Sequence, residues 1–191
     1  MNLLIRPITS KNQDDFLSLF SNDNFSHDSS WKKCYCISYH TTYTPEEWHR
    51  LTDEDNILEA RKKITSGVIK GLLAYDDNKC VGWVNVNNTL SYTRILDNLD
   101  DQFKDGNTAM AICFLVEKEH RGKQIASALL EAAILYCQDF GYKKLISLVN
   151  RDNHKVSNFR CAANMYLDRG FEEYTDSLGN YYVVKKLERL L

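Results

Sequence analysis

Apolar and polar positions follow two kinds of pattern along the chain, which predict strands and helices in turn. Short apolar runs bounded by turn residues predict strands, and apolar residues recurring every three or four positions predict amphipathic helices. The predicted order is β-α-α-β-β-β-α-β-α-β-β, an α/β (α+β) fold with a mixed central sheet of about seven strands flanked by helices. The predicted strands are residues 2–8, 71–75, 80–86, 108–116, 144–149, 171–174 and 181–185.

Capping signals predict where the early helices begin. Thr9 or Ser10 is expected to cap a helix that follows the first strand. Further on, Thr44 is followed by a proline at the first helical position and by Glu47 three residues after the cap. Thr52, with Asp55 three residues later, predicts a second start, for a helix that ends at Gly67.

The central part of the chain predicts a buried strand followed by a long helix. Residues 108–116 are nearly all apolar, as expected for a strand covered on both faces. Residues 122–140 then carry apolar side chains at helical spacing, and Gly141 follows as a C-cap. A second apolar stripe, from Val156 to Tyr166, ends at Gly170.

Composition limits the class of protein. The chain has 191 residues, of which 43% are hydrophobic, so we expect one folded domain spanning residues 1–191. Its 24 basic and 26 acidic residues give a net charge of −2. With no clustered positive charge, neither nucleic acid nor an anionic membrane is expected as a partner. Nothing in the sequence decides the oligomeric state, and a homodimer is left open.

The six cysteines do not indicate a disulfide framework. The chain starts MNLLIRPITS, whose apolar run is too short for a signal peptide, and no apolar run approaches the length of a membrane span. We therefore expect a cytoplasmic protein with free thiols.

The residues that indicate chemistry lie between Phe114 and Leu130. Here an apolar strand passes through a turn containing Arg121, Gly122 and Lys123 into an amphipathic helix. The exposed amides of a first helical turn, aided by the helix dipole, form an anion site suited to a pyrophosphate. The alternative is a solvated loop between a generic strand and helix.

This segment resembles the cofactor motif of the GNAT superfamily of acyl-CoA-dependent N-acetyltransferases. The family pattern Gln/Arg-x-x-Gly-x-Gly/Ala falls on residues 119–124, where Gly122 fits, while Glu119 and Gln124 depart from it. The predicted element order is GNAT-like over almost the whole length, and residues 164–171 (NMYLDRGF) resemble the closing motif of the family. Residues 31–36 (WKKCYC) and 81–86 (VGWVNV) are also similar to a bacterial subgroup of that superfamily.

The resemblance implies a site for acetyl-CoA as co-substrate, with no metal. Two parallel strands, residues 109–116 and 144–149, would splay to admit the pantetheine arm. Tyr166 would be the general acid that protonates the departing thiolate; packing in the apolar stripe of its helix is the alternative. The implied cofactor-binding residues are Phe114, Leu115, Val116, Arg121, Gly122, Lys123, Gln124, Ile125, Ala126 and Asn158.

The base that deprotonates the amine is not identified by the sequence. The place of the glutamate found in some family members falls near Thr108, which cannot serve. Asp105, Glu117, His120 and a chain of water molecules remain as alternatives, and a solvated surface role is the other interpretation of each side chain.

Three further groups of residues have a possible functional interpretation. Cys34, Cys36 and His40 offer three metal ligands at an unusual spacing, for which packing or lining of the acceptor pocket is the better account. The surrounding aromatic residues would wall the acceptor site or anchor a long loop; they are Trp31, Tyr35, Tyr39, Tyr43 and Trp48. An acidic stretch would attract a cationic amine or be a solvated loop; it comprises Asp97, Asp100, Asp101 and Asp105.

Three hypotheses of different classes follow. The first is an N-acetyltransferase that transfers an acetyl group from acetyl-CoA to a primary amine of a small molecule or protein by direct attack in a ternary complex. The second is a non-catalytic acyl-CoA-binding or sensor module. The third is a thiol-based redox or metal protein that uses residues 34–36. Low basicity favours a small, cationic amine acceptor within the first hypothesis.

Overall fold

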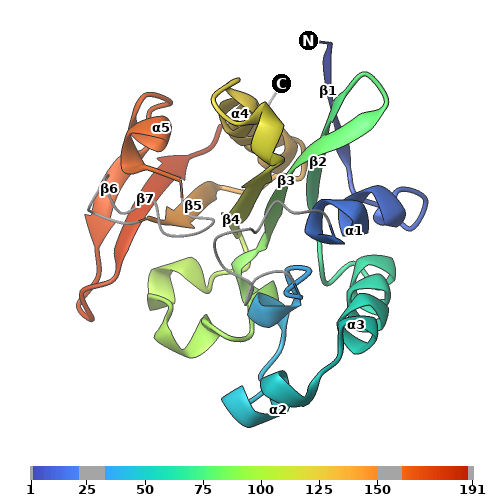
Figure 1. Ribbon diagram of the computed structural model, residues 1–191. Coiled ribbons are helices and arrows are strands. Elements are labelled where there is room, and N and C mark those ends of the chain that lie inside the picture. Colours follow the sequence, from blue (N-terminus) through green and yellow to red (C-terminus); the bar gives the residue numbers. More distant parts are fainter. Residues whose placement is uncertain (1, 22–32, 150–160, 189–191) are drawn as a thin grey trace.

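All strands that the structure describes join one mixed sheet (Figure 1). The computed structural model describes residues 2–21, 33–149 and 161–188. The strand order is β1-β2-β3-β4-β5-β7-β6, and the β4–β5 pair is parallel while the other pairs are antiparallel. The seven-stranded mixed sheet predicted from the sequence is therefore confirmed. The strands are β1 (Leu3–Pro7), β2 (Gly71–Asp76), β3 (Lys79–Asn88), β4 (Thr108–Val116), β5 (Lys144–Leu148), β6 (Glu172–Thr175) and β7 (Tyr181–Lys186).

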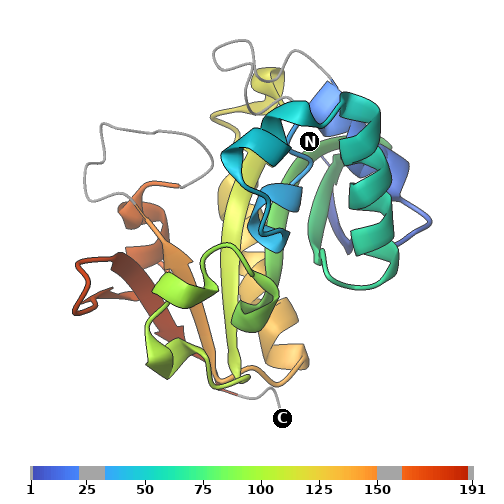
Figure 2. The ribbon, with the colours of Figure 1, turned by 90° about the horizontal axis from the view of Figure 1, so that it is seen from below.

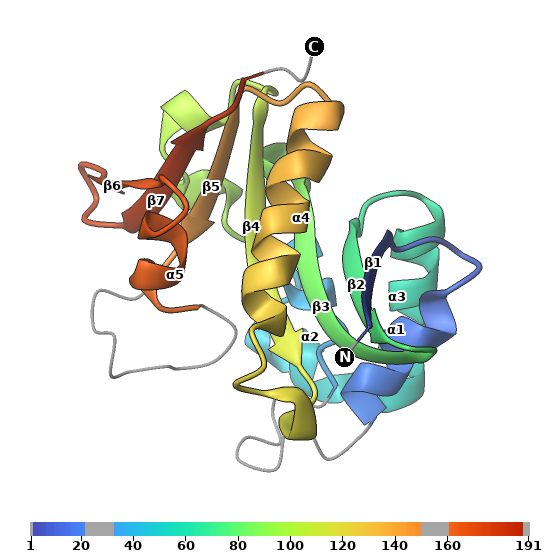
Figure 3. The ribbon, with the colours of Figure 1, turned by 90° about the horizontal axis from the view of Figure 1, so that it is seen from above.

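Helices cover both faces of this sheet. One face, called here the α4 face, is covered by α4 (Ile125–Asp139) and α5 (Ala163–Leu167) (Figure 3). The other, called the α3 face, is covered by α1 (Gln13–Ser21), α2 (Pro45–Arg50) and α3 (Asp53–Thr65), with the segments 33–44 and 89–107 beside them (Figure 2). Each face has its own buried apolar cluster, so the sheet separates two cores.

Both predicted capping signals form capping boxes. The Thr44 side chain accepts from the backbone N–H of Glu47, and the Glu47 carboxylate accepts from the backbone N–H of Thr44. Thr52 and Asp55 do the same at the start of α3. Each box satisfies amides that a helix start leaves without intrahelical partners.

The structure corrects three details of the sequence prediction. Within the described residues, three α-helices precede β2, where the predicted order has two. The first begins at Gln13 rather than beside Thr9 or Ser10, because the Asn12 side chain accepts from the Thr9 amide and holds this stretch in a turn. The long helix begins at Ile125, since Gly122 and Gln124 adopt left-handed backbone conformations that a helix excludes.

Candidate active site

The two central strands pair only at their beginnings. The β4–β5 register runs from Thr108 opposite Lys144 to Met110 opposite Ile146, and beyond this point the strands diverge (Figure 3). On its other side β4 carries a bulge, because Trp83 pairs with Leu115 while Asn85 pairs with Ile112. A bulge bends the strand that carries it and re-aims its backbone groups. The splayed pair of strands predicted from the resemblance is therefore present.

The Tyr166 hydroxyl lies where the strands part. It is 3.0 Å from the Ser147 hydroxyl of β5, which donates a 2.7 Å hydrogen bond to the carbonyl oxygen of Ala111 on β4. Because the single proton of the serine is used on Ala111, the phenol is the donor in the pair with Ser147. Ala111 is the first β4 residue beyond the paired segment. Tyr166 and Ser147 thus tie α5 and β5 to the mouth of the splay.

The surroundings of Tyr166 keep its hydroxyl protonated. Burial raises its pKa well above the ordinary value for tyrosine, and the nearby Cys161 adds to this effect. Its ring packs edge-on against Phe114, at 6.2 Å between ring centroids, and against Phe171, at 5.3 Å. A phenol in this position offers a proton rather than a negative charge.

The turn that precedes α4 presents its backbone to solvent. Gly122 has a φ of 77° and Gln124 a φ of 61°, and no side chain caps α4. Residues 121–124 are exposed, and a Cβ at Gly122 would meet no atom within 4 Å. The first amides of an uncapped helix lack intrahelical acceptors. Together with the left-handed residues before them, these amides suit an anion such as a phosphate.

The side chains of the predicted cofactor residues point in different directions. Phe114 and the buried Ile125 pack in the core of the α4 face, while Leu115 packs in the core of the α3 face. Arg121 donates through Nε to the carbonyl oxygen of Val116, which secures the turn to the end of β4. Lys123 and Gln124 are exposed and Ala126 is partly buried. Asn158 lies outside the described residues, as do Val156 and Trp31.

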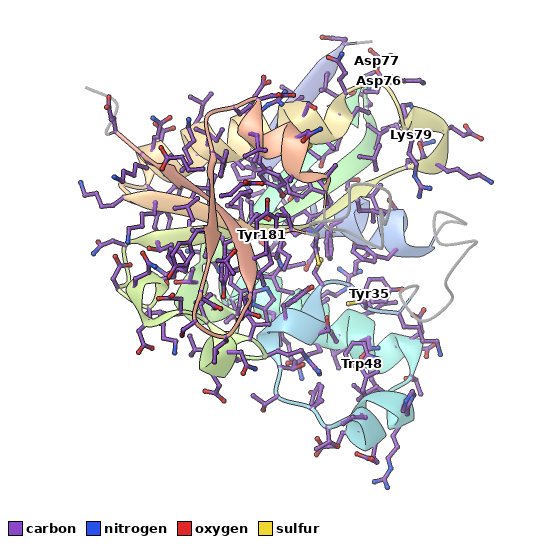
Figure 4. The ribbon with its side chains drawn as sticks, turned by 90° about the vertical axis from the view of Figure 1, so that its left-hand side faces the viewer. Tyr35, Trp48, Asp76, Asp77, Lys79 and Tyr181 are labelled. Atoms are coloured by element: carbon purple, nitrogen blue, oxygen red, sulfur yellow. The ribbon has the colours of Figure 1, made fainter. Side chains whose placement is uncertain are left out.

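Two of the candidate bases are engaged with each other. Glu117 is 2.8 Å from Nδ1 of His120 and 2.6 Å from Nζ of Lys79, and Asp76 is 3.6 Å from Nε2 of His120. Figure 4 shows Asp76 and Lys79 together at the end of the β2–β3 hairpin. This network joins the hairpin to the turn before α4, and it gives both candidates a structural role.

The third candidate base, Asp105, caps the start of β4. Its carboxylate accepts from the Thr108 hydroxyl and from the Asn107 amide, each at 2.9 Å. Burial opposes ionisation of this carboxyl, but these hydrogen bonds prevail and hold its pKa below the ordinary value. Thr108 marks the paired beginning of β4, so Asp105 lies at the end away from the splay.

Cys34, Cys36 and His40 have separate partners. Cys34 donates to the Ser38 hydroxyl, while Cys36 accepts from the indole N–H of Trp83 at 3.1 Å. His40 is held by the Ser91 carbonyl and by Asn85, so these side chains form no shared ligand set. All six cysteines are free.

His40 belongs to a buried polar network that sequence reasoning did not identify. The Asn85 amide donates to Nε2 of His40, and the Asn85 carbonyl accepts from the Tyr92 hydroxyl. Nε2 is therefore the acceptor, and Nδ1–H donates to the Ser91 carbonyl at 2.7 Å. Burial lowers the pKa of His40 to about 4. This network joins segments 45 and 51 residues apart along the chain.

Two pockets lie beside the aromatic segment and the acidic stretch. The Trp48 pocket, about 390 Å³, lies on the α3 face and is lined by Cys34, Ser38, Tyr39, Pro45, Trp48, His49 and Arg94. The β5 pocket, about 320 Å³, is lined by Ile95, Asn98, Leu99, Leu148, Val149, Gly179, Asn180, Tyr181 and Tyr182. Figure 4 shows Trp48 on α2 and Tyr181 on β7. Of the aromatic residues singled out in the sequence, Tyr39 and Trp48 line the Trp48 pocket, while Tyr35 is buried.

Carboxylates near the β5 pocket organise the chain rather than face a ligand. Asp100 accepts from the Tyr174 hydroxyl at 2.5 Å, and Asp101 pairs with Lys104. Asp176, which sequence reasoning missed, accepts from the backbone and side chain of Asn180 and from Tyr182. The aspartate three residues before Gly179 is the sequence signal that could have revealed this turn.

The described ranges hold neither a cluster of metal ligands nor a membrane-spanning helix. Residues 2–21, 33–149 and 161–188 contain no group of three or more His, Cys, Asp or Glu side chains placed to hold a metal ion. No helix within these ranges is long and apolar enough to cross a membrane.

A parallel strand pair that splays beside an uncapped helix start defines an acyltransferase of the GNAT type. The family model described as "Acetyltransferase (GNAT) family" matches residues 31–171, so the chain belongs to that family. A search of curated protein sequences finds no match to this chain.

Solved structures agree with this fold. An N-acetyltransferase from Staphylococcus aureus Mu50 has a TM-score of 0.59 at 15% identity, over 98% of this chain and 100% of that chain. The PaiA N-acetyltransferase of Thermoplasma acidophilum, in complex with coenzyme A, has a TM-score of 0.55 at 18% identity, over 97% and 99%. A phosphinothricin acetyltransferase from Sinorhizobium meliloti, in complex with acetyl-CoA, has a TM-score of 0.56 at 13% identity, over 98% and 89%.

Proposed function

We propose that this protein is an N-acetyltransferase that transfers the acetyl group of acetyl-CoA to a primary amine by direct attack in a ternary complex. The observation that carries this proposal is the position of the Tyr166 hydroxyl, two hydrogen bonds from the point where β4 leaves β5. A proton donor here lies beside the gap between β4 and β5, where members of this family bind the thioester of acetyl-CoA.

The α4 face supplies the contacts to acetyl-CoA in this proposal. Backbone amides of residues 121–126 bind the pyrophosphate, since α4 is uncapped and the turn before it is exposed. Backbone groups of Phe114, Leu115 and Val116, beyond the paired part of β4, bind the pantetheine arm and polarise the thioester carbonyl. Two of the similar structures hold coenzyme A or acetyl-CoA, which supports the same co-substrate here.

The proposed reaction transfers two protons: one is donated to the departing thiolate, and one is removed from the attacking amine. The neutral amine attacks the thioester carbonyl, the bond from that carbon to sulfur breaks, and Tyr166 gives its proton to the departing thiolate. The amine nitrogen must lose a proton to form the amide. Asp105, Glu117 and His120 are all engaged elsewhere, so we assign that proton to solvent water.

Replacing Tyr166 by Phe tests this role. The hydroxyl is lost while the ring packing stays, so we expect kcat to fall about 100-fold with little change in the KM for acetyl-CoA. The measurement is release of free CoA thiol with an amine library at saturating acetyl-CoA. The matched control is Tyr75→Phe, which removes a buried hydroxyl bonded to Asp15 on the α3 face and should keep kcat unchanged.

The outcomes separate the two leading hypotheses. Unchanged turnover in Tyr166→Phe would remove Tyr166 from the mechanism. Thermal stabilisation by acetyl-CoA without CoA release by any amine would instead make the protein a non-catalytic acyl-CoA-binding module.

A further inference from the structure

The Trp48 pocket combines apolar walls with an uncompensated cation. Tyr39, Pro45 and Trp48 supply apolar surface, and the guanidinium of Arg94 and the imidazole of His49 supply hydrogen-bond donors. Among the described residues that line it, none is a carboxylate. Glu47, one residue before Trp48, uses its carboxylate on its own helix cap.

The Arg94 guanidinium is held in place by neutral acceptors. Its Nε donates to the Ser38 carbonyl at 2.7 Å and its Nη2 to the Tyr43 carbonyl at 3.1 Å. These bonds orient the group without neutralising its charge, and they use two of its five N–H donors. No carboxylate pairs with Arg94 in the part of the chain that the structure describes. An oriented guanidinium with free donors suits a carboxylate.

The pocket lies close to the splay of the central strands. Tyr39, in its wall, packs edge-on against Tyr92 at 6.5 Å between ring centroids. The Tyr92 hydroxyl also lies 2.8 Å from the carbonyl oxygen of Met110, the last β4 residue that pairs with β5. The next residue after Arg94, Ile95, lines the β5 pocket together with Leu148 and Val149. One segment of chain therefore lines both pockets.

We propose that the Trp48 pocket binds the far end of an elongated acceptor, an aromatic or apolar group that carries a carboxylate, while its amine reaches the splay through the β5 pocket. Arg94 is the residue that determines this specificity. That the bound molecule is an acetyl acceptor rests on the proposed function. Its binding to the pocket does not depend on acetyl transfer. It replaces the purely cationic amine expected from composition with an amine that also bears a negative charge.

The binding test uses 3-phenylpropionate and its neutral amide as probes. Trp48 is one of three tryptophans, so its fluorescence reports on the pocket, and Trp48→Phe identifies its share of the signal. In the wild-type protein we expect the acid to bind about tenfold more tightly than the amide. In Arg94→Gln this preference should disappear, whereas Arg94→Lys should retain part of it. Equal affinities for acid and amide in the wild type overturn the proposal.

Two controls distinguish the loss of the Arg94 charge from a general loss of charge or of folded structure. Arg50→Gln removes a positive charge from α2, the same helix that carries Trp48, and should leave the acid preference intact. Circular dichroism and thermal unfolding check that Arg94→Gln is folded, since Arg94 also joins Ser38 to Tyr43. If Arg94→Gln does not fold, the comparison of acid and amide affinities in the wild-type protein alone decides whether the pocket prefers a carboxylate.

The activity test uses glycyl-phenylalanine and its C-terminal amide as acceptors. We expect kcat/KM for the acid to exceed that for the amide about tenfold, and this ratio to fall to about one in Arg94→Gln. If the acid binds selectively but no amine causes CoA release, the proposed function is wrong and the proposed pocket specificity stands. If CoA is released with no preference between acid and amide, the proposed function stands and the pocket specificity is wrong.

Discussion

The two faces of the sheet place their candidate ligand-binding groups by different means. On the α4 face, the groups proposed to bind acetyl-CoA are backbone amides of a short turn and of one strand, placed by Gly122, Gln124 and the β4 bulge. On the α3 face, the pocket and the polar network are built from side chains of segments far apart along the chain. Backbone recognition depends on local conformation, whereas side-chain recognition depends on tertiary packing.

The largest expected effect is a loss of folding stability at low pH, which tests the side-chain network around His40 on the α3 face. The folded pKa of His40 is about 4, below the ordinary value of 6.5, because the buried ring is held neutral. The contribution of the neutral His40 ring to the free energy of unfolding is fully present above pH 6.5. It is lost as the pH falls to 4, because in that range His40 binds a proton in the unfolded chain but not in the folded protein. The loss is at most about 3 kcal/mol.

Urea unfolding at several pH values between 4 and 7 measures this contribution. His40→Gln keeps a hydrogen-bonding side chain but cannot titrate, so its stability should fall less steeply over this range than that of the wild type. Parallel pH profiles of the two proteins would show that the network does not hold His40 neutral.

An intermediate effect tests whether backbone placement governs the α4 face. A Cβ at Gly82 of β3 would lie 2.9 Å from Cγ2 of Ile125 and 3.2 Å from Cδ1 of Leu129. Gly82→Ala should therefore push the first turn of α4 away from the sheet, destabilise the protein by about 2 kcal/mol and raise the KM for acetyl-CoA.

A double-mutant cycle with Ile125→Ala checks the cause. That substitution removes the clashing methyl group, so the two changes together should cost at least about 1 kcal/mol less than the sum of their separate costs. Additive costs would mean that the strain at Gly82 does not act through α4.

The smallest effect concerns the departure from the family motif at Gln124. This residue has a φ of 61°, a conformation that favours glycine. Gln124→Gly should stabilise the protein by about 0.5 kcal/mol, because relief of strain outweighs the extra freedom of the unfolded chain. Lys123→Gly is the matched control: Lys123 has no positive φ, so this change should destabilise. Chemical denaturation of both variants decides the sign.

The sequence by itself determined the order of the strands and the position of the turn before α4. Apolar periodicity and capping residues act over a few positions, so seven strands and the caps at Thr44 and Thr52 could be predicted from neighbours alone. The strand-turn-helix around Gly122 was equally local. The shift of the first helix to Gln13 was missed because the Asn12 side chain competes with the helix for backbone donors.

Only the tertiary structure decided what surrounds the two pockets and the splayed strands. The partners of His40, the tether of Arg94 and the closeness of Tyr166 to Ala111 join residues 36 to 56 positions apart or from separate elements. Such contacts depend on how strands pair and how segments pack across a sheet, and no local pattern records that. The bulge in β4 belongs here too, because it arises from register with β3 and appears in the sequence only as an unbroken apolar run.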